Sequence, residues 1–312
     1  CPAQYPIRRG IPRFPLASEQ GTHNKTLHTQ RTYNFTWRRF GQQEIKQDWE
    51  KDSYQYTEKI PQSLISGATK LGLDAGCGGG ADLLRLAASG TPIGGVDVSA
   101  GVETAYRATH HLANVFIVQA DIHHLPFRPH TFDFIYSFGV LHHLPDPARG
   151  LHNLVQLLKP DCPLLTYLYE DFGDRSSLER WTLSVVGGIR KFTARLPPGL
   201  LYAFCWLLVP FVWALCAVPA RLLRRAAPRL VESIPFRHTL KWSVLVSDLF
   251  DRFAPPLERR FSHRGVMRLY EHAGLGRIEI HRHRGWVSWG FTPSTPIQKP
   301  TETGEVSEES RQ

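Results

Sequence analysis

Residues 71–80 read LGLDAGCGGG, and this stretch decides the fold. An apolar run ends at Asp74 and passes directly into glycines, which are followed by the helix-forming run ADLLRLAA. This order predicts a buried strand, a tight glycine turn and a helix, an arrangement that lets the backbone approach a nucleotide closely. Gly76, Gly78 and Gly80 do not have the spacing G-x-G-x-x-G, and no Gly-Lys-Ser/Thr follows. The turn is therefore neither the dinucleotide fingerprint nor a Walker loop.

Three further apolar segments share this end-of-strand pattern. PIGGVDVS (92–99) carries Asp97, VFIVQAD (115–121) ends at Asp121, and FDFIYSFGVLHHLPDP (132–147) runs from a strand into a loop and a helix that starts at a proline. Separated by helical patterns, these strands predict a parallel sheet with helices on both faces. Such sheets bind ligands at the carboxyl ends of their strands, where a carboxylate like that of Asp97 can accept hydrogen bonds from ribose hydroxyls.

Taken together, these segments resemble a known family. LDAGCGGG, VDVS, ADIHHLPF, FDFIYSFGVLHHLPDP and LLKP, in this order and spacing, look like the motifs of a class I S-adenosylmethionine-dependent methyltransferase of the type 11 kind. The resemblance covers residues 70–170 and, more weakly, residues 262–292. It implies an α/β fold with a Rossmann-like, seven-stranded, mostly parallel sheet, and S-adenosyl-L-methionine as the cofactor.

The resemblance also implies a role for each strand end. The glycine turn would hold the methionine part of the cofactor, Asp97 would take the ribose hydroxyls, and Asp121 with Ile122 would lie beside the adenine. The end of the fourth strand would line the sulfonium side. The cofactor-binding residues implied in this way are Asp74, Ala75, Gly76, Cys77, Gly78, Gly80, Asp97, Val98, Asp121, Ile122, Ser137, Phe138 and Gly139.

Two adjacent histidines are the candidate catalytic residues. A methyl transfer needs a base only when the acceptor must lose a proton, as an enol, a phenol or a sugar hydroxyl must. His142 and His143 follow the fourth strand directly, and imidazole titrates close to neutral pH. The alternative is that one packs against the strand and the other orients the loop. The remaining histidine pairs, at 110–111, 123–124 and 281 with 283, point apart or lack a carboxylate or cysteine partner, so we predict no metal site.

The chain divides by composition into five parts. It has 312 residues and is 42% hydrophobic, enough for one large domain with an added module. We predict an N-terminal arm (1–53), a cofactor-binding core (54–170), a helical insertion after strand five (171–261), the last helix and two strands of the core (262–292) and a disordered tail (293–312). CPAQYPIRRGIPRF in the arm is either a β-turn segment without metal or the remnant of a zinc-ribbon-like module.

The local patterns set several element boundaries. A helix is predicted over 54–67, and a short helix in the arm is expected to cover the cofactor. PLLTYLYE (163–170) is predicted as strand five. SHRGVMRLYEHAGL is predicted as a helix capped by Ser262 and ended by Gly274. Two strands separated by Gly285 then form a hairpin that completes the sheet.

The insertion contains a long uncharged segment. Residues 196–220 include LLYAFCWLLVPFVWALCAVP, and basic residues flank both ends, so the length could cross a bilayer. A single span conflicts with strands on both sides of the insertion belonging to one sheet. Prolines at 197, 198, 210 and 219 predict two short helices. We therefore expect a lid with an apolar, substrate-facing surface or interfacial membrane attachment through residues 197–220, with an oligomer contact or a true span as alternatives.

Charge and cysteine usage set the expected surroundings. The net charge is +9, and residues 171–261 carry fourteen basic and seven acidic residues. A basic flank of this kind is a solvated face, or meets an anionic membrane or nucleic acid. The five cysteines, at positions 1, 77, 162, 205 and 216, form no C-x-x-C pair, which favours a reducing, cytoplasmic location. Because Cys1 stands where an initiator would be, we interpret the chain as a fragment.

The sequence predicts an S-adenosylmethionine-dependent methyltransferase that acts on a small or lipid-like acceptor, such as a quinone precursor, polyketide, isoprenoid or glycan. The basic charge supports one alternative, an RNA methyltransferase or nucleic-acid-binding protein. A second alternative is a catalytically inactive, membrane-associated protein that kept the sheet. The expected location is the cytoplasm, with membrane association through the insertion.

Overall fold

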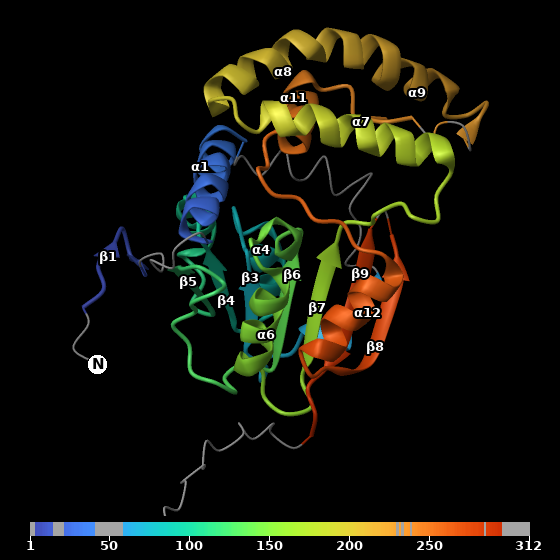
Figure 1. Cartoon of the computed structure of the whole chain (residues 1–312). Helices are drawn as coiled ribbons and strands as arrows, with labels where there is room; N and C mark the ends of the chain where they lie inside the picture. The colour runs from blue at the N-terminus through green and yellow to red at the C-terminus, as the bar shows by residue number, and fades with distance from the viewer. Residues whose placement is uncertain are drawn as a thin grey trace, which may run out of the picture.

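The centre of the protein is a seven-stranded sheet (Figure 1). The computed structural model describes residues 4–14, 22–40, 59–228, 231, 234–237, 239–283 and 285–294. The strands of the sheet are β3 (Gly72–Ala75), β4 (Ile93–Asp97), β5 (Val115–Gln119), β6 (Phe134–Phe138), β7 (Pro163–Leu168), β8 (Gly276–Arg282) and β9 (Trp286–Phe291). Their order is β5-β4-β3-β6-β7-β9-β8, with β3 to β7 parallel and β9 antiparallel to both neighbours. The predicted Rossmann-like sheet, including its closing hairpin, is confirmed.

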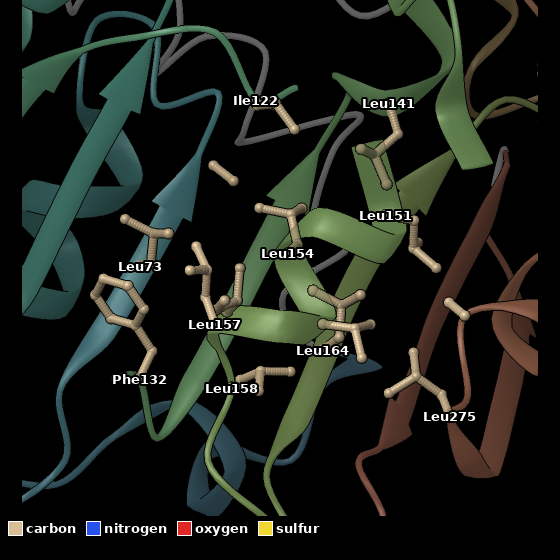
Figure 2. Packing of buried hydrophobic residues seen from close by; sticks show 14 of the residues in the cluster. Leu73, Ile122, Phe132, Leu141, Leu151, Leu154, Leu157, Leu158, Leu164 and Leu275 are labelled. Carbon is tan, nitrogen blue, oxygen red and sulfur yellow. The ribbon is translucent and has the colours of Figure 1, made fainter. Parts of the chain in front are cut away.

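Helices cover both faces of this sheet because its central strands, β3, β4, β6 and β7, are buried on both sides. Side chains alternate along a strand, so Leu73 and Ile135 face one core while Phe134 and Tyr136 face the other. The first core is closed by α6 (Pro147–Leu157) and α12 (His263–His272), the second by α4 (Ala81–Ala88) and α5 (Gly101–Thr109). Figure 2 shows the first core, with leucines of α6 packed against β3 and β7.

Two predicted helix boundaries are set by side-chain caps. The Ser262 hydroxyl accepts a hydrogen bond from the Gly265 N–H at 3.0 Å and so begins α12. Gly274, at φ 83°, lies just after the end of this helix. Asp146 caps α6 in the same way, accepting from the Arg149 N–H at 3.0 Å.

The arm contributes a hairpin and a long helix. β1 (Ile7–Arg8) and β2 (Ile11–Pro12) form an antiparallel pair, and the Phe14 N–H, shortly after it, donates to the Gln119 carbonyl at the edge of the main sheet, 2.9 Å away. The helix α1 (Thr22–Phe40) has 19 residues, longer than the short helix expected there. Cys1, the one cysteine of the proposed zinc-ribbon remnant, lies outside the described residues.

The helix predicted over 54–67 is much shorter in the part that the structure describes. Within the described part of this segment, α3 (Gln62–Ile65) is the α-helix. Pro61 before it and Ser66 after it have extended backbones, and these end the helix on both sides. Residues 54–58 lie outside the described residues, as does most of the predicted tail, from residue 295 onward.

The insertion contains α7 (Ser177–Thr193), α8 (Pro198–Val212), the π-helical turn η3 (Trp213–Ala217), α9 (Val218–Leu223) and α11 (Trp242–Phe253). The prediction of two short helices was wrong, because α8, η3 and α9 form one continuous helix of 26 residues. Pro210 lies inside it and removes one backbone hydrogen bond, and the π turn that follows is the kind of local adjustment by which helices accommodate a proline.

A third apolar core joins the insertion to the arm. Leu201, Cys205 and Val209 of α8 pack with Leu249 and Phe250 of α11. From α1, Phe35 stacks on Phe250 with ring centroids 5.2 Å apart, and Phe40 contacts Tyr202 at 5.7 Å. Figure 1 shows α1, α7, α8 and α11 beyond the end of the sheet to which β7 points. These helices therefore form a third layer over the carboxyl ends of the strands.

We expect that Leu154→Ala lowers the free energy of unfolding by about 2–5 kcal/mol, because the side chain is fully buried between α6 and the sheet and its removal leaves a cavity. Urea denaturation followed by circular dichroism measures this change. Leu215→Ala is the matched control: its side chain is 74% exposed, so its effect should stay within about 0.5 kcal/mol. Equal losses in both variants would contradict the packing described here.

Candidate functional site

The glycine turn between β3 and α4 has a backbone that only glycine adopts easily. Gly76, Gly78 and Gly80 have φ values of 97°, 49° and 79°. A Cβ atom on Gly78 would lie only 2.1 Å from the indole ring of Trp37 on α1. The backbone of the turn therefore lies close to α1. This helix of the arm covers the turn, in agreement with the helical cover that the sequence predicted there.

Asp97, at the end of β4, holds this turn in place. Its Oδ2 atom accepts a hydrogen bond from the Gly78 N–H at 2.9 Å, and its Oδ1 atom accepts one from the Ser99 N–H at 2.7 Å. The Val96 carbonyl accepts from the Gly76 N–H at 2.7 Å. Each carboxylate oxygen has a further lone pair, so Asp97 can bind the turn and still accept from a ligand.

Asp121, after β5, forms a buried ion pair. Its Oδ1 atom accepts from both the backbone N–H and the Nδ1–H of His123, each at 2.9 Å. The other ring nitrogen of His123 lies 3.0 Å from the Asp146 carbonyl, so both nitrogens face acceptors, an arrangement that favours the imidazolium form. Burial opposes both charges, but the hydrogen bonds between the two overcome it. They lower the pKa of Asp121 and raise that of His123.

The strand order brings these separate segments into one row. β5, β4, β3 and β6 are consecutive neighbours in the sheet. Asp121, Asp97, the glycine turn and the end of β6 therefore lie side by side along one edge. This is the order adenine, ribose, methionine and sulfonium in which the family resemblance assigned them.

The end of β6 is attached to the glycine turn from the other side. The Ser137 hydroxyl donates to the Ala75 carbonyl at 2.7 Å, and Gly139 has φ 77°. Asp74 is buried beside Tyr136, whose pKa is raised by burial and then by the Asp74 carboxylate. These contacts fix the carboxyl ends of β3 and β6 relative to each other.

Some of the predicted cofactor-binding residues have side chains in the cores of the protein. Ala75 and Ile122 belong to the core under α6, Cys77 to the core under α4, and Phe138 packs against Tyr136 with ring centroids 5.0 Å apart. Only their backbone lies in the row of strand ends. The Val98 carbonyl already accepts hydrogen bonds from the side chains of Gln30 on α1 and Gln119 on β5, at 2.7 and 3.0 Å.

His142 and His143 lie in the short helix η2 (Leu141–His143), after β6, and their surroundings differ. His142 is fully buried and stacks on Tyr169 with ring centroids 3.8 Å apart. Neither of its ring nitrogens has a partner among the described residues. Burial, and then the neighbouring His143, lower its pKa well below the ordinary imidazole value, so the ring is neutral.

His143 is also neutral but has a defined tautomer. Its Nδ1 atom lies 2.7 Å from the Leu257 carbonyl, which can only accept, so Nδ1 carries the proton and Nε2 keeps a lone pair. Burial lowers the pKa of this ring despite the raising effects of the Leu257 hydrogen bond and the Glu258 charge. The Tyr33 ring of α1 meets it edge-on, with centroids 5.6 Å apart. His143 therefore lies between the core, the arm and the segment after α11.

Several site residues escaped sequence reasoning because they come from the arm and the insertion. Besides Tyr33 and Trp37, Asn34 of α1 accepts from the Ala100 N–H at 2.5 Å. Asp251 of α11 has a pKa raised to about 7 by burial and then by the neighbouring acids Asp248 and Glu258. The aromatic side chains of the run YNFTW (33–37) indicated that this segment packs against another part of the protein. The sequence did not show which part.

The Asp121–His123 pair should make stability depend on pH. Its contribution requires an ionised Asp121 and a protonated His123. It should be lost as the pH falls through the lowered pKa of Asp121, and should shrink as the pH rises through the raised pKa of His123. In His123→Asn the loss of unfolding free energy should therefore be largest between the ordinary values 3.8 and 6.5, measured by urea denaturation across pH. For the exposed His110→Asn we expect no such maximum; a flat difference for His123→Asn would refute the ion pair.

Comparison with known proteins finds a family match for the middle of the chain. Residues 73–166 match the profile of a family described as methyltransferase domain. Phthiotriol/phenolphthiotriol dimycocerosates methyltransferase 1 of Mycobacterium ulcerans is 29% identical over 133 residues, which are 42% of this chain and 48% of that protein. Ubiquinone biosynthesis O-methyltransferase of Coxiella burnetii is 36% identical over 90 residues, 28% of this chain and 38% of that protein.

Among solved structures, YcgJ of Bacillus subtilis aligns with a TM-score of 0.46 and 14% identity, over 73% of this chain and 71% of that one. The chain spans less than half the length of the two curated relatives named above. The family profile covers the segment that carries the glycine turn, Asp97, Asp121 and the end of β6. Residues 73–166 thus match a methyltransferase-domain family, and the strands of this segment belong to the seven-stranded, mostly parallel sheet.

Proposed function

We propose that this protein transfers a methyl group from S-adenosyl-L-methionine to a small or lipid-like acceptor. The observation that carries the proposal is the row formed by Asp121, Asp97, the glycine turn and the end of β6 along one edge of the sheet. We propose residues 54–170 and 262–292 as the catalytic core and residues 171–261 as its lid. Both the sheet edge and the lid are needed, one for the donor and one for the acceptor.

The residues of the row fit a nucleoside with an attached amino acid. The glycines of the turn carry no side chains, which permits close approach of a ligand to their backbone on the side that Trp37 of α1 does not cover. The Asp97 carboxylate keeps lone pairs for ribose hydroxyls, and within the described residues Asp121 uses only its Oδ1 atom, for His123. The bound cofactor would supply an electrophilic methyl group on a sulfonium, so the protein needs to position the acceptor and exclude water.

We propose that His143 is the base when the acceptor is a hydroxyl group. Its neutral ring presents Nε2 with a free lone pair, while Nδ1–H is held by the Leu257 carbonyl. The acceptor oxygen would gain the methyl group and lose its proton to Nε2, and the proton then passes to water. His142, stacked on Tyr169 without a partner for either ring nitrogen among the described residues, is proposed as a packing residue.

The apolar lid supports a lipid-like acceptor. The long helix of residues 198–223, uncharged as far as residue 220, lies in the layer over the carboxyl ends of the strands, and its inner face packs on α11. The two relatives are named for lipid and quinone substrates, a dimycocerosate and ubiquinone precursors, which is consistent with such an acceptor. We also propose that residues 197–220 contact a membrane, where acceptors of this kind are dissolved.

Asp97→Ala should weaken binding of S-adenosyl-L-methionine by about 1–3 kcal/mol, because buried hydrogen bonds from ribose to a carboxylate are lost. Isothermal titration calorimetry measures this change. Asp161→Ala, an exposed acid at the opposite end of the sheet, should bind with unchanged affinity.

A cofactor analogue separates this contact from the structural role of Asp97 in the glycine turn. With 2′,3′-dideoxy-S-adenosylhomocysteine, the difference between the protein and Asp97→Ala should nearly vanish. If the variant binds the normal and the dideoxy ligands with the same penalty, Asp97 holds the turn and not the ribose. Unchanged affinity for S-adenosyl-L-methionine would remove the site assignment altogether.

His143→Gln should lower kcat by about 10²–10⁴-fold for a hydroxylated quinone precursor, because the proton acceptor is lost. Burial lowers the pKa of His143 below 6.5, so the protein's own activity should fall only below that pH, and this acidic limb should disappear in the variant. Release of S-adenosylhomocysteine is the assay. His142→Phe keeps the stacking on Tyr169 and should retain most of kcat; equal losses in both variants would contradict the assignment.

A further inference from the structure

The outer side of the long helix in the insertion is an exposed apolar stripe. Spacings of three, four and seven residues place these side chains along one side of the helix. They are Leu200, Phe204, Leu207, Phe211, Leu215 and Leu222, between 41% and 75% exposed. A contiguous apolar surface of this kind is unusual for a soluble protein and marks a contact.

The same helix is also apolar on its inner side, where it packs on α11. Leu201, Cys205 and Val209 are buried there. Leu201 and Cys205 each follow a residue of the exposed stripe directly, and Val209 lies between two of them. Over the most apolar 18-residue window the mean hydropathy is 2.2, yet only 22% of that window is buried. The helix is therefore unlike the core helix of a soluble protein, because most of its apolar surface is left uncovered.

A second stripe lies on α7. Trp181, Val185, Ile189 and Phe192 follow each other at spacings of four, four and three, and are between 40% and 73% exposed. Only residues 194–197 separate α7 from α8, and both helices contact α11. Figure 1 shows the two helices in the layer farthest from the centre of the sheet. We call these two lines of side chains the outer stripes.

The charges in the chain from Arg180 to residue 231, which includes both outer stripes, have one sign. No acidic residue occurs between Glu179 and Glu232, whereas eight lysines and arginines do. Lys191 and Arg195 lie exposed at one end of the long helix, and Arg221 and Arg225 at the other. Exposed apolar side chains bordered by basic ones match the boundary between acyl chains and anionic headgroups.

We propose that the outer stripes of α7 and of α8–α9 form a docking surface for an anionic phospholipid bilayer, with the long helix lying in the plane of the interface. A span is opposed by the sheet, since β7 before the insertion and β9 after it are hydrogen-bonded neighbours on one side. It is opposed as well by α11, which occupies the inner face of the long helix. The sequence suggested only residues 197–220, and the structure adds α7.

This surface goes beyond the proposed methyl transfer and does not require it. Membrane binding depends on apolar and basic side chains of the outer layer, whereas cofactor binding depends on the row of strand ends. A vesicle assay and a cofactor titration on the same variants therefore report on different parts of the protein. Failure of either proposal leaves the other measurable.

The test uses flotation of the full chain with two kinds of vesicle, phosphatidylcholine alone and phosphatidylcholine with phosphatidylserine. The chain should float with the anionic vesicles and much less with the neutral ones. In the triple variant Leu207→Gln, Phe211→Gln, Leu215→Gln, the partition coefficient should fall at least about tenfold, because apolar area is removed without a change of charge. Ile7→Gln is the control: its side chain is 71% exposed, on the hairpin of the arm, and flotation should be unchanged.

Two more variants separate the parts of the surface. Trp181→Gln with Phe192→Gln should weaken binding to both vesicle types through α7. Lys191→Gln with Arg195→Gln should remove most of the preference for anionic vesicles, as should high salt. All these residues are exposed, so thermal unfolding and S-adenosyl-L-methionine affinity should stay as in the unmodified chain.

Each opposite outcome overturns part or all of the proposal. Equal flotation of the triple variant and the unmodified chain, or no binding to either vesicle, would reject the docking surface. Resistance of the vesicle-bound chain to extraction with alkaline carbonate would reject the in-plane placement in favour of a span. A dimer that the triple variant dissociates, without lipid binding by the unmodified chain, would assign the stripes to a second copy instead.

Discussion

The rest of the site depends on the hydrogen bonds that the Asp97 carboxylate accepts. Asp97 ends β4, yet it binds the Gly78 N–H of the neighbouring turn and the Ser99 N–H of its own loop. Because the turn has left-handed glycines and only the Cys77 side chain to anchor it in a core, these hydrogen bonds help to set its shape. The parallel sheet supplies the geometry, since only a parallel arrangement brings the ends of β3 and β4 to one edge.

The layer above this edge has a different physical character. The sheet below it is closed by two cores on its faces, whereas α1, α8 and α11 pack mainly on each other through aromatic and aliphatic contacts. Their attachment to the sheet combines hydrogen bonds of Asn34 and Gln30 with ring contacts of Tyr33 and Trp37, and the Leu257 carbonyl after α11 adds a hydrogen bond to His143. One apolar layer can therefore lie over the ligand edge and still present an apolar outer surface, because its helices are apolar on more than one side.

Features that depend on residues close together in the sequence could be predicted, and features that depend on distant residues could not. The strands, the glycine turn and the caps of α6 and α12 were predictable because each depends on residues a few positions apart. Two expectations failed for the opposite reason. Residues 198–223 form one helix despite Pro210 and Pro219, since packing on α11 and a π turn outweigh the lost backbone hydrogen bonds. The predicted helix at 54–67 is limited to Gln62–Ile65 in the described part, because the backbone is extended on either side of it.

The sequence by itself determined the order of strands and helices, the nucleotide-type turn at 76–80 and the acids at the strand ends, because periodicity and local hydrogen bonding are written in neighbouring residues. Only the tertiary structure decided which groups face one another there. It set the tautomer of His143 through Leu257, it formed the ion pair of His123 with Asp121 against the Asp146 carbonyl, and it brought α1 over the glycines. These contacts join segments that lie far apart in the chain or fix how near neighbours point. Burial keeps His143 neutral, whereas hydrogen bonds favour the charged forms of Asp121 and His123 against burial.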